Sequence, residues 1–286
     1  MNNFEADQYL RNVLEQRANV SCYSPKEEEA FNHISRYVKE WMDTCISQSG
    51  YAHTAWILAN TIVTHSVQKS GSRAKGTSIK GKSDLDIFIS INDPGDRYSP
   101  EQYSESLYNF FKRKFPTARR QNVSTGIVYN GFDIDITVAK RIKRTVYTGS
   151  NSYNDHYLFL SKDPKPRRMQ TNIETHINFV RQSGRLQEIK LMKIWKARHD
   201  LDIPSIYLEV LIVETLRGDQ SFTLAERLIK IFSALQYVES KQVIDPANSA
   251  NNIAESIPNA EKRRIKQVAS DCRTLASIGA WNSVIW

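Results

Sequence analysis

The chain has 286 residues, and its 39 lysines and arginines against 31 acidic residues give a formal net charge of +8 at pH 7. That length is enough for one large hydrophobic core or two smaller ones, and the basic balance suits a polyanionic partner. Three scattered cysteines (Cys22, Cys45 and Cys272) and six histidines without zinc spacing indicate neither a disulfide framework nor a Cys/His metal knuckle. Because we find neither a secretory leader nor an apolar run of about 18 residues, we expect a cytoplasmic protein that does not span a membrane.

The first strongly patterned segment is a helix that begins near residue 25. Ser24-Pro25-Lys26-Glu27 has the residues of a capping box, with proline at the first helical position. Apolar residues then recur every three or four positions, which predicts one face packed against a core. These residues are Phe31, Ile34, Val38, Trp41, Met42 and Cys45. Residues 61–70 fit both a helix end and a strand.

A turn of small residues follows at Gly71. Gly71 and Gly76 have no side chain that would keep a phosphate away from the backbone, and Ser72 adds a hydroxyl donor. This turn therefore predicts a place for a nucleotide triphosphate.

Two acidic residues enter the strand that comes next. Asp84 and Asp86 come just before the apolar run 87–91. The period-two geometry of a strand puts both of their side chains on one face. Two clustered carboxylates repel each other unless a cation lies between them. Mg²⁺ favours such oxygen sites and keeps positions for water and substrate phosphates, so the pair predicts a metal site.

A second capping box and two strands complete the first half of the chain. Ser99-Pro100-Glu101-Gln102 begins a helix that carries apolar residues at 107, 110 and 111. Two strands near 121–129 and 132–138 are joined by the turn Asn130-Gly131. We expect these strands and the one at 87–91 to form a sheet with helices around it.

A third carboxylate is available on the last of these strands. Asp133 and Asp135 alternate with apolar residues and share the polar face. Such a group can act as a general base on an attacking hydroxyl, or complete the ligands of a second metal about 3.5–4 Å from the first. The alternation leaves Asp133 and Asp135 both as candidates.

The pattern changes to helices from about residue 171. We place a soft boundary at 165–170, which separates a domain at 1–168 from a domain at 169–286. In the helix at 184–196, Lys193 lies beside the apolar seam, from which it can reach a phosphate or extend to solvent. The next helix begins at Pro204, with Ser205 as a candidate N-cap and Tyr207 as a candidate core aromatic. Residues 243–253 predict a turn, in which Asp and Asn side chains bond to local backbone, followed by a helix.

Residues 71–86 read Gly-Ser-x-x-Lys-Gly-Thr-x-x-x-Gly-x-Ser-Asp-x-Asp, which resembles the polymerase-beta-like nucleotidyltransferases. The sequence is most similar to the branch that contains the oligoadenylate synthetases and the bacterial cGAS/DncV-like (CD-NTase) enzymes. Residues 191–195 are similar to that family's apolar-Lys-x-Trp element, and residues 205–209 to its Ser-x-x-Leu-Glu segment. Residues 245–253 are similar to its Asp-Pro-x-x-x-x-Asn-Asn-Val loop, so the resemblance covers about residues 70 to 255.

This resemblance implies an α/β (α+β) fold. It consists of a nucleotidyltransferase palm with a mixed sheet and N-terminal helices, and a helical second lobe, with the active-site cleft between them. It also implies that Asp84, Asp86 and Asp135 are catalytic and hold two Mg²⁺ ions, for which Mn²⁺ can substitute. Asp135 fits the family pattern better than Asp133. The implied nucleotide-binding residues are Gly71, Ser72, Lys193, Ser205 and Tyr207.

The function that the resemblance implies is the joining of NTPs, with ATP favoured, into a cyclic or linear oligonucleotide second messenger for antiviral or antiphage signalling, with release of pyrophosphate. Two alternatives stay open. One is a template-independent RNA nucleotidyltransferase of the CCA-adding or poly(A) type, and the other is an idle scaffold that binds nucleic acid. RNA, as activator or acceptor, would bind basic patches at residues 112–120, 140–144 and 162–168. No sequence pattern indicates the base specificity, the linkage of the product, its length or the oligomeric state.

Overall fold

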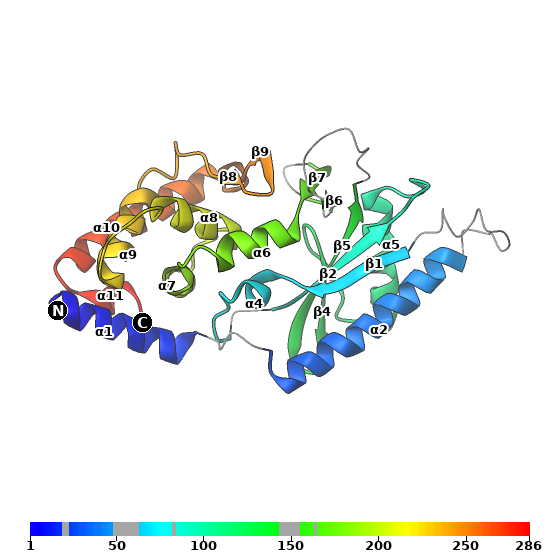
Figure 1. Ribbon diagram of the computed structural model, residues 1–286, viewed down its shortest axis with the longest axis horizontal. Helices are drawn as coiled ribbons and strands as arrows, with labels where there is room; N and C mark the ends of the chain where they lie inside the picture. The colour runs from blue at the N-terminus through cyan, green and yellow to red at the C-terminus, as the bar shows by residue number, and fades with distance from the viewer. Residues whose placement is uncertain (19–22, 48–62, 82–83, 143–154, 163–164) are drawn as a thin grey trace. The chain divides into compact units, whose positions relative to one another are not determined.

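The structure is a computed structural model that describes residues 1–18, 23–47, 63–81, 84–142, 155–162 and 165–286 (Figure 1). The chain forms two compact units. The first, called the helical unit, comprises Met1–Ser21, Lys75–Ser83 and Thr175–Trp286. The second, called the sheet unit, comprises Cys22–Ala74 and Asp84–Glu174.

A seven-stranded sheet forms the centre of the sheet unit. Its elements are α2 (Pro25–Ser47), β1 (Val63–Lys69), α4 (Gly71–Lys75), β2 (Leu85–Asn92), α5 (Pro100–Lys114), β3 (Arg119–Arg120), β4 (Thr125–Tyr129), β5 (Phe132–Arg141), β6 (His156–Leu160) and β7 (Arg167–Thr171). The strand order is β1-β2-β5-β4-β3, and β6 pairs with both β5 and β7. Because β2 and β5 are parallel while β4 and β5 are antiparallel, the predicted mixed sheet is confirmed.

The two faces of β2 have different neighbours. Leu85, Ile87 and Ile89 point into a core that helices α2 and α5 complete. Burial of each such side chain contributes about 1.5–3 kcal/mol, which fixes the register of the strand because a slip of one residue would expose the whole apolar row. Strand alternation then places Asp86 on the opposite face, away from α2 and α5.

Local signals in the sequence set the ends of several elements. The Ser24 N–H donates to Glu27 Oε2 at 2.6 Å and the Glu27 N–H donates to Ser24 Oγ at 3.3 Å, so the first capping box is confirmed. The box of Ser99 at the start of α5 is confirmed in the same way. Asn130 and Gly131 both have positive φ, as the tight turn between β4 and β5 requires.

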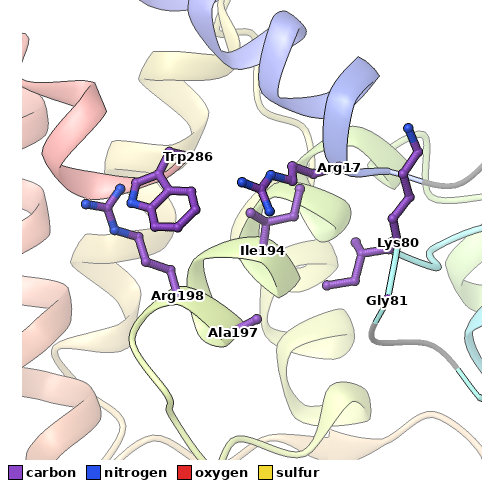
Figure 2. A pocket seen from close by; sticks show the side chains of 8 residues that line it. Arg17, Lys80, Gly81, Ile194, Ala197, Arg198 and Trp286 are labelled. Carbon is purple, nitrogen blue, oxygen red and sulfur yellow. The ribbon is translucent and has the colours of Figure 1, made fainter.

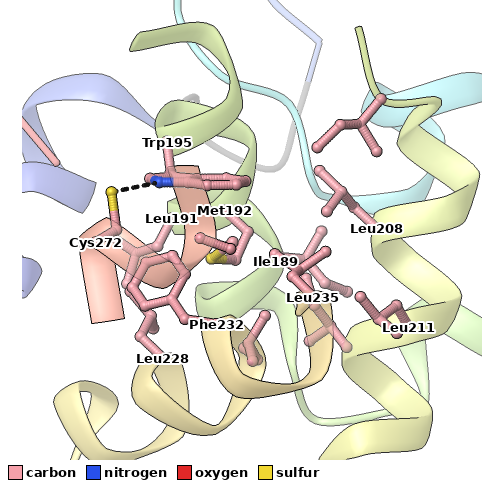
Figure 3. Close-up of a cluster of buried hydrophobic side chains, with 14 of the residues drawn as sticks. Ile189, Leu191, Met192, Trp195, Leu208, Leu211, Leu228, Phe232, Leu235 and Cys272 are labelled. Carbon is pink, nitrogen blue, oxygen red and sulfur yellow. Dashed lines mark hydrogen bonds between the residues drawn. The ribbon is translucent and has the colours of Figure 1, made fainter. Parts of the chain in front are cut away.

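The helical unit is built around Trp195 (Figure 3). Its elements are α1 (Asn3–Arg17), α6 (Ile173–Arg181, whose first two residues belong to the sheet unit), α7 (Leu186–Arg198), α8 (Ser205–Thr215), α9 (Leu224–Leu235), β8 (Ile244–Asp245), β9 (Asn248–Asn252), the 3₁₀ turn η1 (Ile253–Ser256), α10 (Asn259–Ser277) and α11 (Trp281–Val284). Trp195 is fully buried, and its Nε1–H donates to Cys272 Sγ at 3.3 Å. This bond satisfies the indole donor inside an apolar core.

The two compact units are not contiguous along the chain, whereas the predicted domains 1–168 and 169–286 are. Helix α1 packs its apolar residues Ala6, Leu10 and Val13 into the core of the helical unit. Residues 75–83 belong to the same unit, where Ile79 forms a bridge with Ala18. Sequence order conceals this grouping because α1 precedes the whole sheet unit. Among the described helices, none is long and apolar enough to cross a membrane.

Candidate active site

Two carboxylates lie side by side in the sheet unit on adjacent parallel strands. Asp86 of β2 is the direct register partner of Asp135 of β5, so both side chains project from the same face. Asp84 lies just before β2 and is two residues from Asp86. The structure therefore brings together the three carboxylates that the sequence predicts.

The electrostatics of this group favour a bound cation. Burial and the neighbouring Asp133 raise the pKa of Asp84. Burial and the charge of Asp84 raise the pKa of Asp135 to about 6. Carboxylates that are held close and partly desolvated ionise reluctantly unless a positive charge offsets their repulsion.

Asp133 and Asp135 have different surroundings. Asp133 is exposed and pairs with Arg119 at 3.1 Å. Asp135 is partly buried and accepts a hydrogen bond from Gln121 Nε2 at 2.8 Å. The Gln121 amide is oriented in turn by Ser124, whose hydroxyl donates to Gln121 Oε1 at 2.6 Å. Asp135 is therefore the carboxylate that the sheet unit holds in a fixed position beside Asp86.

The fold requires glycine at position 71 for a reason that the sequence alone does not reveal. Its φ is +60°, and a Cβ at this position would lie 1.8 Å from Asp86 Oδ2 and 2.2 Å from Asp86 Cγ. The neighbouring Ser70 N–H donates to the backbone oxygen of Asp86 at 2.9 Å. The start of α4 is thus closed directly on Asp86, and any side chain at Gly71 would displace that carboxylate. Ser72 is the second residue of α4 and is half-buried.

The donor chemistry of the three aspartates fits a hard divalent cation such as Mg²⁺, which takes one or two carboxylates and completes its shell with water and phosphate oxygens. Within the described residues, no group of three or more His, Cys, Asp or Glu side chains has the geometry of a formed metal site. The assignment of metal to Asp84, Asp86 and Asp135 stays a prediction.

A second polar cluster is buried inside the helical unit, around Glu209 of α8. Lys193 Nζ donates to Glu209 Oε1 at 2.8 Å and to Thr77 Oγ1 at 2.8 Å. Lys75 Nζ donates to the other carboxylate oxygen at 2.7 Å. Burial by itself raises the pKa of Glu209, but the two lysines outweigh it and lower that pKa to about 2. One ionised carboxylate therefore holds two ammonium groups.

Sequence reasoning missed Glu209, Lys75 and Thr77, although a signal for Glu209 exists. Residues 206–213 form an apolar run in which Glu209 is the one charged residue. A lone carboxylate inside such a helix predicts a buried ion pair, because an unpaired charge there would cost several kcal/mol. The partner Lys75 is 134 positions away in sequence, so no pattern identifies it.

Ser205 and Tyr207, the two residues of α8 that the sequence predicts as nucleotide ligands, lie in different surroundings. Ser205 is exposed and is the first residue inside the helix, with Pro204 at the N-cap, so the proposed N-cap role of Ser205 is wrong. Tyr207 is fully buried in the hydrophobic core. A ring without exposed surface cannot stack on a base, so Tyr207 is corrected to a core aromatic, as the apolar pattern of its helix requires.

The predicted turn at residues 243–253 is confirmed as a short hairpin. Asp245 Oδ1 accepts from the Ala247 N–H at 2.8 Å, and Asp245 Oδ2 accepts from Asn251 Nδ2 at 3.0 Å. His176 of α6 also lies 2.6 Å from Asp245 through Nε2. The predicted helix follows as the short 3₁₀ helix η1 and then α10, which begins at Asn259.

Comparisons with known proteins agree with this geometry. No family model matches the chain. A cyclic AMP-AMP-AMP synthase from Escherichia coli (strain MS 115-1) is 22% identical over 240 residues, which cover 71% of this chain and 73% of the relative. The structure of E. coli MS115-1 CdnC with ATP has a TM-score of 0.67 at 18% identity and covers 95% of this chain and 91% of that chain. The structure of Bradyrhizobium diazoefficiens CdnG with GTP has a TM-score of 0.69 at 12% identity and covers 96% and 92%.

The chain shares the fold of these solved structures, as predicted, and it pairs Asp86 with Asp135 on adjacent parallel strands. The matches confirm the predicted resemblance to the bacterial cGAS/DncV-like (CD-NTase) branch.

Proposed function

We propose that this protein is a nucleotidyltransferase that joins NTPs into a cyclic or linear oligonucleotide second messenger and releases pyrophosphate. The observation that carries the proposal is the register of β2 and β5, which puts Asp86 and Asp135 side by side while Gly71 closes on Asp86. Phosphoryl-type transfer needs charge neutralisation and in-line positioning more than covalent chemistry. A row of carboxylates would hold the cations that neutralise this charge, and a small-residue turn would let the backbone position the triphosphate.

The residues have distinct roles in this reaction. We propose that Asp84, Asp86 and Asp135 hold two Mg²⁺ ions, which would neutralise the charge that develops on the α-phosphate and on the leaving pyrophosphate. Asp135, kept in place by Gln121, is also the group that can accept the proton of the attacking ribose hydroxyl. Gly71 and Ser72 are proposed to bind the triphosphate through the backbone and the hydroxyl.

Lys193 and Ser205 of the helical unit are proposed as further triphosphate ligands. The ammonium group of Lys193 is fixed by Glu209 and Thr77, so little side-chain entropy remains to be lost when it binds an anion. Ser205 presents an exposed hydroxyl at the start of α8. Tyr207 is not part of the proposed site, because it is buried.

The names of the related proteins support a product of the second-messenger type. One relative is a cyclic AMP-AMP-AMP synthase, and solved neighbours contain ATP or GTP. We therefore propose NTP substrates with ATP favoured, and a role in antiphage signalling in the cytoplasm.

The alternative, addition of nucleotides to RNA, needs a basic surface that is available to RNA. In the described part of the first two basic patches, five cationic side chains already have partners inside the sheet unit. These contacts are Lys112 with backbone oxygens of Pro116 and Ala118, Lys114 with Glu40, Arg119 with Asp133, Arg120 with Glu105, and Lys140 with Asp93 and Asp96. Lys143 and Arg144 lie outside the described residues. These two patches thus give less support to RNA binding than their sequence suggests.

Incubation with each radiolabelled NTP and Mg²⁺, with and without double-stranded RNA, tests the proposal. We expect small products whose label resists phosphatase, and a 3′-5′-specific nuclease then reports the linkage. Label retained on added RNA would favour the terminal transferase. The double variant Asp84→Ala with Asp86→Ala should abolish NTP consumption, and unchanged consumption would refute the assignment. Asp135→Asn should be far more damaging than Asp133→Asn on the same strand.

A further inference from the structure

A cationic pocket of about 190 Å³ lies within the helical unit (Figure 2). Three of its lining residues are the cations Arg17, Lys80 and Arg198, and none of the eight residues that line it is acidic. Ile79 and Ile194 are nearly buried and supply apolar lining. None of these residues has a part in the nucleotidyl transfer proposed above.

Backbone pairing fixes the positions of these cations. The Lys80 N–H donates to the carbonyl oxygen of Arg17 at 2.8 Å, next to the bridge between Ala18 and Ile79. Arg17 is the last residue of α1, so Lys80 is tied to the end of that helix. Arg198 is the last residue of α7, and its Nη1 donates to the backbone oxygen of Asn282 at 3.0 Å.

The indole of Trp286 orders both guanidinium groups. Arg17 Cζ lies 4.9 Å and Arg198 Cζ lies 5.2 Å from the ring centroid, and Figure 2 shows the indole between the two side chains. A guanidinium group held against a ring keeps its planar set of N–H donors available for bidentate contact with an oxyanion. This arrangement reduces the entropy that the two arginines would lose on binding a ligand.

The positive charge of the three cations exceeds the partial negative charge at the two helix C-termini beside them. Cations at the carboxyl end of a helix offset about half a negative charge, and Lys80 Nζ does lie 3.3 Å from the backbone oxygen of Glu15 in α1. Two helix ends therefore account for about one of the three positive charges. Within the described part of the chain, Arg17, Lys80 and Arg198 form no ion pair with a carboxylate. Burial also lowers the pKa of Arg198, so its charge is held at a cost.

We propose that this pocket binds a small anion that carries phosphate groups, of about the size of pyrophosphate or a nucleoside monophosphate. The two guanidinium groups and the Lys80 ammonium group bind the phosphate oxygens, and the apolar lining together with Trp286 accommodates a ring where the ligand has one. The ligand needs no metal ion, because the protein itself supplies the positive charge.

Calorimetric titration of the full chain with pyrophosphate and, separately, with AMP tests this site. The protein carries Asp84→Asn and Asp86→Asn, and the buffer contains a chelator, so that metal-dependent binding at the aspartates is removed. We expect one equivalent of anion to bind, and Arg17→Gln with Arg198→Gln to weaken that binding by roughly tenfold or more. The matched control, Arg263→Gln with Arg273→Gln, removes the same charge from exposed positions of α10 and should bind like the parent.

Three results would overturn the proposal. They are no binding of either anion by the parent, equal binding by the pocket variant and the parent, or equal loss in the pocket variant and in the α10 control, which would indicate only a net-charge effect. If the double pocket variant does not fold by circular dichroism, Lys80→Gln provides the same test, because its exposed side chain contributes little to the core.

Discussion

Replacement of Glu209 by glutamine is expected to remove a pH-dependent part of the stability of the helical unit. The carboxylate is almost completely buried and holds both Lys75 and Lys193. These contacts lower the pKa of Glu209 from its ordinary value of 4.5 to about 2. A carboxylate with a lowered folded-state pKa contributes stability above the unfolded-state value and loses it as the pH falls toward the folded-state value.

The magnitude follows from these two values. At 1.36 kcal/mol per pH unit, the difference between 4.5 and about 2 corresponds to about 3 kcal/mol of unfolding free energy at pH 7. At pH 3 the ionisation of Glu209 still contributes about 1 kcal/mol to the unfolding free energy. Glu209→Gln should therefore cost about 3 kcal/mol at neutral pH, and the cost should shrink by about two thirds on acidification.

Urea unfolding monitored by circular dichroism at pH 7, 5 and 3 measures this difference between wild type and variant. Glu214→Gln on the same helix is the matched control, because Glu214 is exposed and, among the described residues, forms an ion pair with Arg217 alone; its cost should stay below about 1 kcal/mol. A cost of Glu209→Gln that is the same at all three pH values would refute the reasoning, since it would mean that ionisation of Glu209 is not coupled to folding.

Three further predictions concern the candidate site. Gly71→Ala should lower kcat by about 100-fold or more in a folded protein, because its Cβ would displace Asp86, whereas Gly131→Ala, also at positive φ but with open space around it, should keep activity; equal losses would point to backbone strain alone. Mn²⁺ binding should weaken as the pH falls below about 6, because burial and Asp84 raise the pKa of Asp135 to about 6 and a ligand must lose its proton to bind metal; equal affinities at pH 5 and 7.5 in a metal titration would contradict this. Tyr207→Phe should change neither the KM for ATP nor, by more than about 1 kcal/mol, the stability, because the buried hydroxyl has no hydrogen-bond partner among the described residues; a raised KM would contradict this and mean that the hydroxyl contributes to nucleotide binding.

The elements that the sequence predicts well depend on neighbouring residues. The capping box of Ser24 and the turn at Asn130-Gly131 are confirmed, because a cap or a tight turn is decided by hydrogen bonds and φ values within about four positions. The placement of Asp84 and Asp86 at the entry to β2 is confirmed for the same reason, since alternation along one strand decides which side chains share a face. The family resemblance added the fold, which no local pattern contains.

The tertiary structure decided everything that depends on residues far apart in the chain. It gave Asp135 and Asp133 different surroundings, because register pairs Asp135 with Asp86, 49 positions earlier, whereas the exposed Asp133 pairs with Arg119. It buried Tyr207, and it grouped α1 with the C-terminal helices because their apolar faces share one core. The sequence by itself thus determined the residues that can carry the chemistry, and packing determined which of them are buried, paired or exposed, since burial and charge pairing depend on neighbours that only the folded chain brings together.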